Sequence, residues 1–336
     1  MSLQSRWSTL LIDDASIKQL GVIPTDHYLN HADLLAARRL RPRDLYRRWE
    51  EQQWNALEID LSQDAVDFAK RLPRRAKREL SWHIASFIIG EYTGLDLLSP
   101  ILTGSHSEED SLFLATQLAD EARHSRMMFR VGEEVLGLNP DPEIMLRQSW
   151  DLMITEQQEM AVEETALVQA VVAAPTDYVA WLRAVTYFHM INEGMLALVG
   201  QRVIVGDLGR MGLMPGIRAA FAGMCRDESR HVGFGLYALR IGMHEGHAEA
   251  IYDVLESVVP RAAALTDGPD GSTSPQPARD LFEQALRRAT GAIGADTTFT
   301  EHLVDQVRTA RSLSPEQVAS DPQHVQPPHP RERVPA

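Results

Sequence analysis

The sequence predicts an all-α fold in which long helices pack side by side as a bundle. Two observations support this prediction. Residues that favour helices (Ala, Leu, Glu, Arg, Gln and Met) dominate the chain of 336 residues. Apolar residues also recur at spacings of three and four over long stretches, and short segments containing Gly or Pro separate these stretches. Long helices that follow one another in this way favour a single helical bundle domain.

The predicted helices account for most of the chain. Two short helices are expected at 31–40 and 43–54, and Ser62 is expected to cap a third over 63–72. Longer helices are expected at about 74–102, 111–136, 143–172, 178–205, 217–243 and 244–265. A loop at 267–278 precedes a short helix at 279–289. We therefore expect one domain over 1–311, followed by a proline-rich, disordered tail over 312–336.

Composition and charge narrow the function classes. The formal charge of −14 argues against a nucleic-acid partner, because the phosphate backbone selects basic surfaces. Cys225 is the only cysteine, so no disulfide can form within the chain and a reducing compartment is expected. The N-terminus lacks the basic start and apolar core of a secretory signal, and no apolar run approaches the roughly 20 residues that span a bilayer. These observations predict a cytoplasmic protein without a membrane span.

Two five-residue motifs carry the chemistry. "DEARH" ends at His124 and "DESRH" ends at His231, and the Glu three residues before each His is Glu121 or Glu228. About one Glu-x-x-His pair is expected by chance in a chain of this composition, but the longer motif is expected only about 0.06 times. Residues three apart project from the same helix face, so one carboxylate and one imidazole can bind one metal ion. Taken alone, either pair is better explained as a buried salt bridge or a core histidine.

Two further glutamates, Glu91 and Glu193, lie on apolar helix faces. The order along the chain is then lone Glu, Glu-x-x-His, lone Glu, Glu-x-x-His, which is the ligand set of ferritin-like dinuclear carboxylate bundles. Four carboxylates can neutralise two divalent cations, and oxygen donors with few nitrogens favour iron or manganese. The sequence therefore predicts a ferritin-like bundle with an Fe/Fe or Mn/Fe core at about 74–243 and extra flanking helices. The predicted ligands are Glu91, Glu121, His124, Glu193, Glu228 and His231.

Neighbouring side chains have supporting or alternative roles. Glu163 or Glu164 is an alternative to the second lone glutamate as a ligand, because both also neighbour apolar residues. His189 is expected either to support the site or to be structural. Asp120 and Asp227 each precede a ligand, and we expect each carboxylate to hydrogen-bond the remote nitrogen of the histidine on the facing helix.

The chain from about 54 to 242 resembles the ribonucleotide reductase small-subunit superfamily, and within it the oxidases that bind a ligand at a manganese/iron pair. The matching stretches are "WNALEIDLSQD", "FIIGEYTGLD", "TQLADEARHS", "NEGMLALVG" and "RDESRH". The resemblance implies that the six residues above bind the metals, and that Trp54 and Asp227 lie beside them, forming an electron route from the surface. In those oxidases a long-chain fatty acid lies at the metals, and oxygen activation forms a valine–tyrosine ether.

Several positions depart from this pattern. The crosslinking valine and tyrosine correspond to Gly94 and Phe188, so the ether is not expected, which leaves fatty-acid binding open. The radical tyrosine of the reductase corresponds to Met128, and the last tyrosine is Tyr252, whereas reductase subunits need one near the C-terminus. Met224 stands where the arylamine N-oxygenases of the wider fold place a third histidine.

The expected function is therefore an oxidase or oxygenase that uses dioxygen and an electron donor to oxidise a small organic or lipid-like substrate. Gly94, Met128, Phe188 and Ala197 are expected to line the substrate pocket. Glycines near the site, such as Gly235, either leave space for a substrate or allow close helix packing. The alternatives are a radical-generating reductase small subunit and a ferritin-like metal-storage protein. We expect a homodimer.

Overall fold

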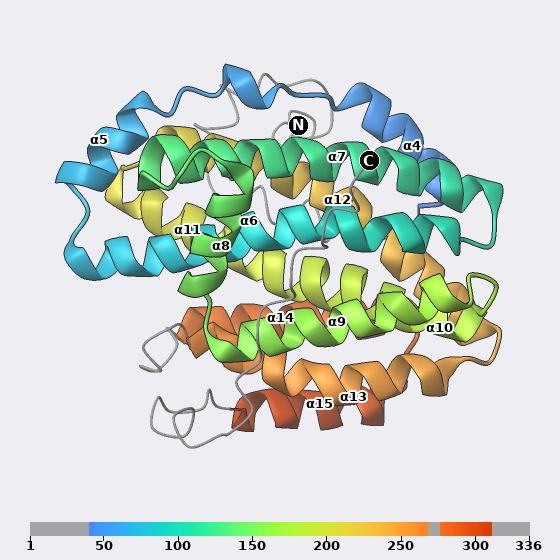
Figure 1. Ribbon diagram of the computed structural model, residues 1–336. Coiled ribbons are helices and arrows are strands. Elements are labelled where there is room, and N and C mark those ends of the chain that lie inside the picture. Colours follow the sequence, from blue (N-terminus) through green and yellow to red (C-terminus); the bar gives the residue numbers. More distant parts are fainter. Residues whose placement is uncertain (1–39, 268–275, 311–336) are drawn as a thin grey trace, which may run out of the picture.

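Every regular element is helical in the part of the chain that the computed structural model describes, residues 40–267 and 276–310 (Figure 1). A central group of long helices consists of α6 (Arg74–Thr103), α7 (Glu108–Val131), the run from α10 (Tyr178–Val185) to α11 (Leu198–Met211), and α12 (Pro215–His244). α6 packs along α7, and α12 packs against both α7 and the α10–α11 run. The all-α bundle that the sequence predicts is confirmed.

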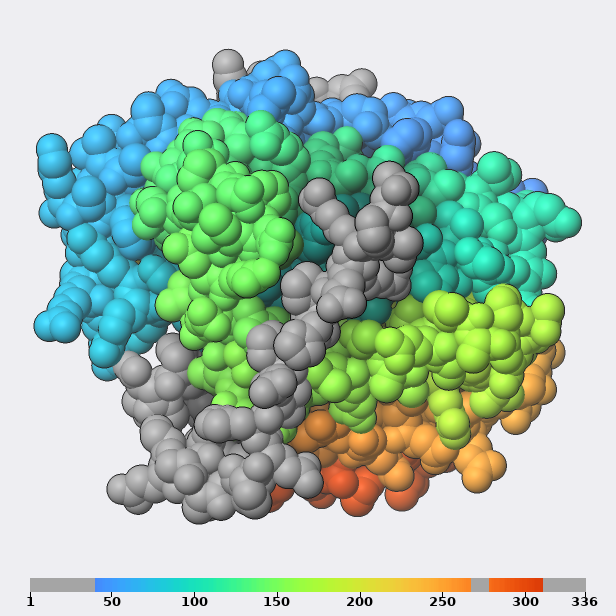
Figure 2. Space-filling view, in the orientation of Figure 1, coloured from blue at the N-terminus to red at the C-terminus, as the bar shows by residue number. Residues whose placement is uncertain are grey.

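Further helices cover this central group. α4 (Pro42–Glu51), the turn η1 (Ala56–Glu58) and α5 (Ser62–Lys70) lie over α7 and α12, and η2 (Gly132–Leu136) extends α7. α8 (Pro142–Leu152) and α9 (Thr155–Ala173) pack on α6. α13 (Ala248–Ala264), the turn η4 (Leu265–Asp267), α14 (Gln276–Ile293) and α15 (Thr297–Thr309) form the remaining layer. Figure 2 shows these layers, with the blue N-terminal helices at one edge and the orange and red C-terminal helices at the other.

The N-terminus of α12 is held by two buried aspartates of α5. The carboxylate of Asp64 accepts the first N–H groups of α12 at 2.9 and 2.7 Å, and that of Asp67 accepts the N–H of Met214 at 2.8 Å. These carboxylates pair donors that have no partner within the helix and complement its dipole. Gly216 has no space for a side chain, because a Cβ there would lie 2.4 Å from the carbonyl oxygen of Asp60. α5 thereby anchors the helix that carries the second Glu-x-x-His pair.

Between α10 and α11 the helix continues as a π-helical segment, η3 (Thr186–Ala197). The run is thus longer than the predicted 178–205, and its middle is not α-helical. A π-helix bonds residues five apart and is widened relative to an α-helix, often at functional sites. Glu193 lies in this segment. The neighbouring α12 approaches it closely at Gly235, where a Cβ would lie 2.3 Å from the Cβ of His189, so this glycine serves close packing.

The segment predicted as one helix at 143–172 is two helices, α8 and α9. Met153 has extended backbone angles and ends α8. The side chain of Gln157 accepts the N–H of Ile154 at 3.4 Å, which caps the start of α9. The apolar periodicity runs through both helices, so it did not reveal this break.

Other predicted bounds also differ. Ser62 is the first residue of α5 rather than its cap, and its N–H donates to the carboxylate of Asp60 at 2.9 Å. α15 was not predicted, although Asp296 caps it by accepting two N–H groups. The predicted helix at 31–40 and the predicted tail at 312–336 lie outside the described residues. Among the described helices, none is both long enough and apolar enough to cross a bilayer.

Candidate metal centre

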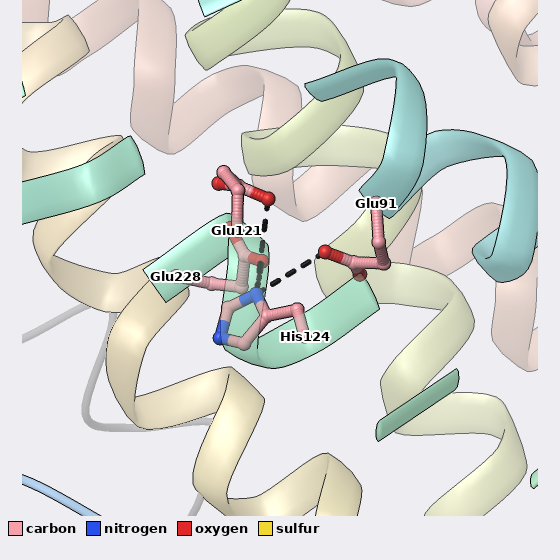
Figure 3. A group of neighbouring side chains, drawn as sticks. All are labelled: Glu91, Glu121, His124 and Glu228. Carbon is pink, nitrogen blue, oxygen red and sulfur yellow. Dashed lines mark hydrogen bonds and ion pairs between the residues drawn. The ribbon is translucent and has the colours of Figure 1, made fainter. Parts of the chain in front are cut away.

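The six predicted ligands come together between the central helices. All are nearly or fully buried, with at most 6% of each residue exposed. Figure 3 shows Glu91 from α6 and Glu228 from α12 directed toward Glu121 and His124 of α7. Buried carboxylates are costly unless they are paired, protonated or bound to a metal ion. Their convergence from separate helices therefore identifies this point of the fold as a candidate metal site.

The ligand atoms form two overlapping groups. Within each group the atoms lie within 4.8 Å of one another. Glu121 and Glu228 belong to both groups, so each of these carboxylates would be available to either ion. The first group is completed by Glu91 and His124, and the second by Glu193 and His231.

Each imidazole turns its Nδ1 atom toward the carboxylates. His124 Nδ1 lies 3.1 Å from Glu91 Oε2 and 3.4 Å from Glu228 Oε1. His231 Nδ1 lies 3.3 Å from Glu228 Oε2 and 3.5 Å from an oxygen of Glu193. Both histidines can therefore present the same nitrogen to an ion held by these carboxylates.

The remote nitrogens contact the two aspartates of the motifs. His124 Nε2 lies 3.1 Å from Asp227 Oδ2, and His231 Nε2 lies 3.2 Å from Asp120 Oδ2. Each aspartate thus reaches the histidine of the facing helix. A histidine that donates Nε2–H to a carboxylate keeps the lone pair of Nδ1 for a metal ion.

Two tryptophans and two arginines complete these contacts. Trp54 donates to Asp227 at 2.6 Å, and Trp49 donates to Asp120 at 2.9 Å. The guanidinium of Arg230 bridges both aspartates at 2.6 and 2.8 Å. Arg123 contacts both as well. The sequence analysis did not identify Trp49 or either arginine, although an Arg directly before each histidine is common to both motifs.

Burial and mutual contact shift the pKa values of the ligands. Burial raises the pKa of Glu91 to about 8 and that of Glu193 well above its usual range. Burial acts in the same sense on Glu228, but hydrogen bonds from His124 and His231 outweigh it and lower its pKa to about 2. Burial alone would lower the pKa of both imidazoles, yet the surrounding carboxylates raise both well above their ordinary value. The cluster therefore attracts positive charge strongly, and metal ions would compete with protons for it.

Glu193 is supported by a chain of hydrogen bonds within the bundle. Gln117 donates to Glu193 Oε1 at 2.8 Å, and the Nε2 atom of His189 lies 3.0 Å from the amide oxygen of Gln117. Gln117 lies one turn before Glu121 on α7 and was not identified from the sequence. The other oxygen of Glu193 is buried and has no hydrogen-bond partner among the described residues. An orphaned buried carboxylate oxygen is what a metal ligand leaves for its ion.

A cavity of about 430 Å³ opens beside the centre. Its lining includes all four predicted carboxylate ligands and the predicted pocket residues Gly94, Phe188 and Ala197. Met128 does not line it. It lies one turn beyond His124 and is fully buried in an apolar cluster with Phe221.

The alternative ligands lie elsewhere. Glu164 lines the cavity but belongs to neither ligand group, and Glu163 contacts Arg261 at the surface of α9. Tyr187, beside Phe188, donates its hydroxyl to the carbonyl of Met160 at 2.8 Å. Its phenol is therefore engaged by the backbone of α9.

Comparison with known proteins identifies the family and supports the fold. The family model "Ribonucleotide reductase, small chain" matches residues 41–265. The chain belongs to the ribonucleotide reductase small-chain family. Solved structures with a similar fold include R2-like ligand-binding oxidases reconstituted with a Mn/Fe cofactor. One, a tyrosine-to-phenylalanine variant, has 24% identity and a TM-score of 0.62, and the match covers 80% of this chain and 93% of that one. Another, a valine-to-isoleucine variant, has 23% identity and a TM-score of 0.63 over the same shares. The predicted ferritin-like fold is thereby confirmed.

The residues present fit a pair of divalent ions. Four carboxylates balance the charge of two such ions, each group offers one imidazole nitrogen, and a buried oxygen of Glu193 is free to bind. The donor set has no thiolate, which disfavours a structural zinc site. Glu91 and His124 would hold one ion, Glu193 and His231 the other, with the remaining two glutamates between them.

Proposed function

We propose that this protein is an oxygen-activating oxidase or oxygenase, holding an Fe/Fe or Mn/Fe pair and acting on an organic substrate. The observation that supports this proposal is that predicted metal ligands form part of the cavity wall. Glu91, Glu121 and Glu193 line a cavity of about 430 Å³, so a molecule within it would lie beside the ions. A metal-storage site has no need of such a cavity.

When bound, the ion pair supplies the chemistry that reduces dioxygen and oxidises a neighbouring molecule. The chain supplies the geometry. Asp227 and Asp120 keep the imidazole protons on the remote nitrogens. Phe188 and Leu196 make part of the cavity wall apolar, and polar interactions are stronger beside an apolar wall. Trp54, partly exposed and hydrogen-bonded to Asp227, is the proposed route for electrons from a donor.

Membership of the reductase family makes a radical-generating subunit the second candidate. The position of the expected radical tyrosine argues against it, because Met128 has no phenol and lies in an apolar cluster. We therefore propose that this chain oxidises its own substrate rather than transferring a radical to a partner.

Elemental analysis after aerobic reconstitution, combined with anomalous scattering at the iron and manganese edges, tests the metal content. We expect two ions per chain, and consumption of dioxygen by this chain alone when an electron donor is added. Ala197→Leu should retain both ions but change which added substrates are oxidised, because it narrows the cavity. Val162→Leu, at an exposed position outside the cavity, is the matched control. Fewer than two ions, or inertness without a large partner protein, would contradict the proposal.

A further inference from the structure

Glu164 is a buried acid in the cavity that the metal centre does not use. It comes from α9 and is 5% exposed. Its carboxyl group contacts the side-chain amide of Asn192, and its Oε1 atom has no hydrogen-bond partner among the described residues. An unpartnered carboxyl oxygen in a largely apolar cavity costs free energy unless a bound molecule satisfies it.

The other charges on the cavity wall are already balanced. Arg75 pairs with Glu79 at 2.8 Å, and Asp207 pairs with Arg210. Burial lowers the pKa of His83 to about 4, so its imidazole is neutral at physiological pH. Among the described residues that line the cavity, no cation remains to receive an anionic group. Among the acids of the described residues that line the cavity, Glu164 alone has neither a cationic partner nor a place among the predicted metal ligands.

We infer that the cavity binds a substrate that carries an amine on an apolar body. The carboxylate of Glu164, positioned by Asn192, binds the amine. This inference rests on the proposed function, because it names the substrate class for the same cavity. The unpartnered oxygen of Glu164 accepts a hydrogen bond from the ammonium group, and the amide of Asn192 holds the carboxylate in place. The apolar body then occupies the part of the cavity lined by Phe188 and Leu196, beside the ligands.

The protonation of Glu164 agrees with this assignment. Burial raises its pKa to about 8, so the carboxyl of the free protein holds its proton at neutral pH. An ammonium group in contact would favour the ionised form, because an opposite charge lowers the pKa of a carboxyl. Glu164 therefore ionises when the amine arrives, and the buried charge is paired only in the complex.

Calorimetric titration with three probes of equal length tests the inference: octylamine, octanol and octanoate. The protein is loaded with manganese and kept free of oxygen, so that the ligand carboxylates are neutralised and no turnover occurs. We expect octylamine to bind more tightly than octanol or octanoate. Glu164→Gln should weaken octylamine at least about tenfold and leave octanol unchanged, because a hydrogen bond to a charged group is lost.

Glu163→Gln is the matched control, since the neighbouring acid contacts Arg261 instead of lining the cavity. It should leave the affinity for octylamine unchanged. Thermal unfolding of Glu164→Gln verifies that the isosteric variant folds. Equal affinity of the wild type and Glu164→Gln for octylamine, or tighter binding of octanoate, would overturn the inference. Because binding is measured without oxygen, a failure of the amine inference would not contradict the proposed oxidase activity. Conversely, a protein that binds octylamine but consumes no dioxygen would contradict only the proposed oxidase activity.

Discussion

The two halves of the candidate metal centre place the same kinds of side chain on different backbones. In the first half, Glu91 comes from a regular α-helix, and its carboxylate lies 3.1 Å from an imidazole. In the second half, Glu193 comes from the π-helical segment η3 and is held by Gln117. The histidines of both halves are alike, since each contacts an aspartate from the facing helix. The paired motifs thus impose symmetry on the histidines, while each lone glutamate depends on its own helix.

The largest effect should follow from removing a shared ligand. Glu121 belongs to both groups, so Glu121→Ala should reduce the metal content from two ions to fewer than one. Glu91 belongs only to the first half, so Glu91→Ala should retain the ion of the second. Elemental analysis of the purified variants measures both. If Glu91→Ala lost both ions as fully as Glu121→Ala, the two halves would not be separable.

The aspartates should have a smaller effect on each half. Asp227→Asn should weaken the ion held by His124, and Asp120→Asn the ion held by His231, each by about 10- to 100-fold. An amide cannot orient the imidazole as a carboxylate does. Competition with a chelator measures the two affinities. Variants with wild-type affinities would show that these contacts are structural only.

The close packing of α12 against η3, in the second half of the centre, can be disturbed by one substitution on α12. Gly235→Ala places a Cβ 2.3 Å from the Cβ of His189, and should lower the free energy of unfolding by about 1–3 kcal/mol. Gly90→Ala is the control, because a Cβ there meets nothing within 4 Å. It should be neutral or slightly stabilising. Denaturant unfolding measures both, and equal stability of the two variants would show that η3 can shift without cost.

The last prediction concerns the pH dependence of stability that an acid belonging to neither half confers. Glu164 keeps its proton to about pH 8 in the folded protein, whereas an unfolded glutamic acid loses it near 4.5. Its contribution to stability is therefore present below pH 4.5 and is lost as the pH rises toward 8. Between pH 5 and 8, Glu164→Gln should gain about 1 kcal/mol per pH unit relative to the wild type. Denaturant unfolding at several pH values measures the free energy of unfolding of both proteins. If this free energy changed with pH in the same way for the wild type and Glu164→Gln, Glu164 would be ionised in the folded protein.

The sequence indicated the helices and the candidate ligands because both depend on local periodicity. Residues three apart share a helix face, so the two DExRH-type motifs, ending at His124 and His231, could be recognised as candidate ligand pairs from the sequence. The break between α8 and α9 was missed because the same periodicity continues through it. Trp49 and Gln117 were missed because their partners lie 71 and 76 residues away along the chain.

By itself, then, the sequence determined an all-helical chain with six candidate ligands in a recognisable order. Only the tertiary structure decided which side chains meet across helices. The rotation and register of two packed helices, and the widening at η3, are set by contacts between distant segments and leave no periodic trace in either one. For the same reason, the places of two residues could not be predicted. Met128, expected in the pocket, lies in the core, and Glu164, considered as a ligand, lines the cavity.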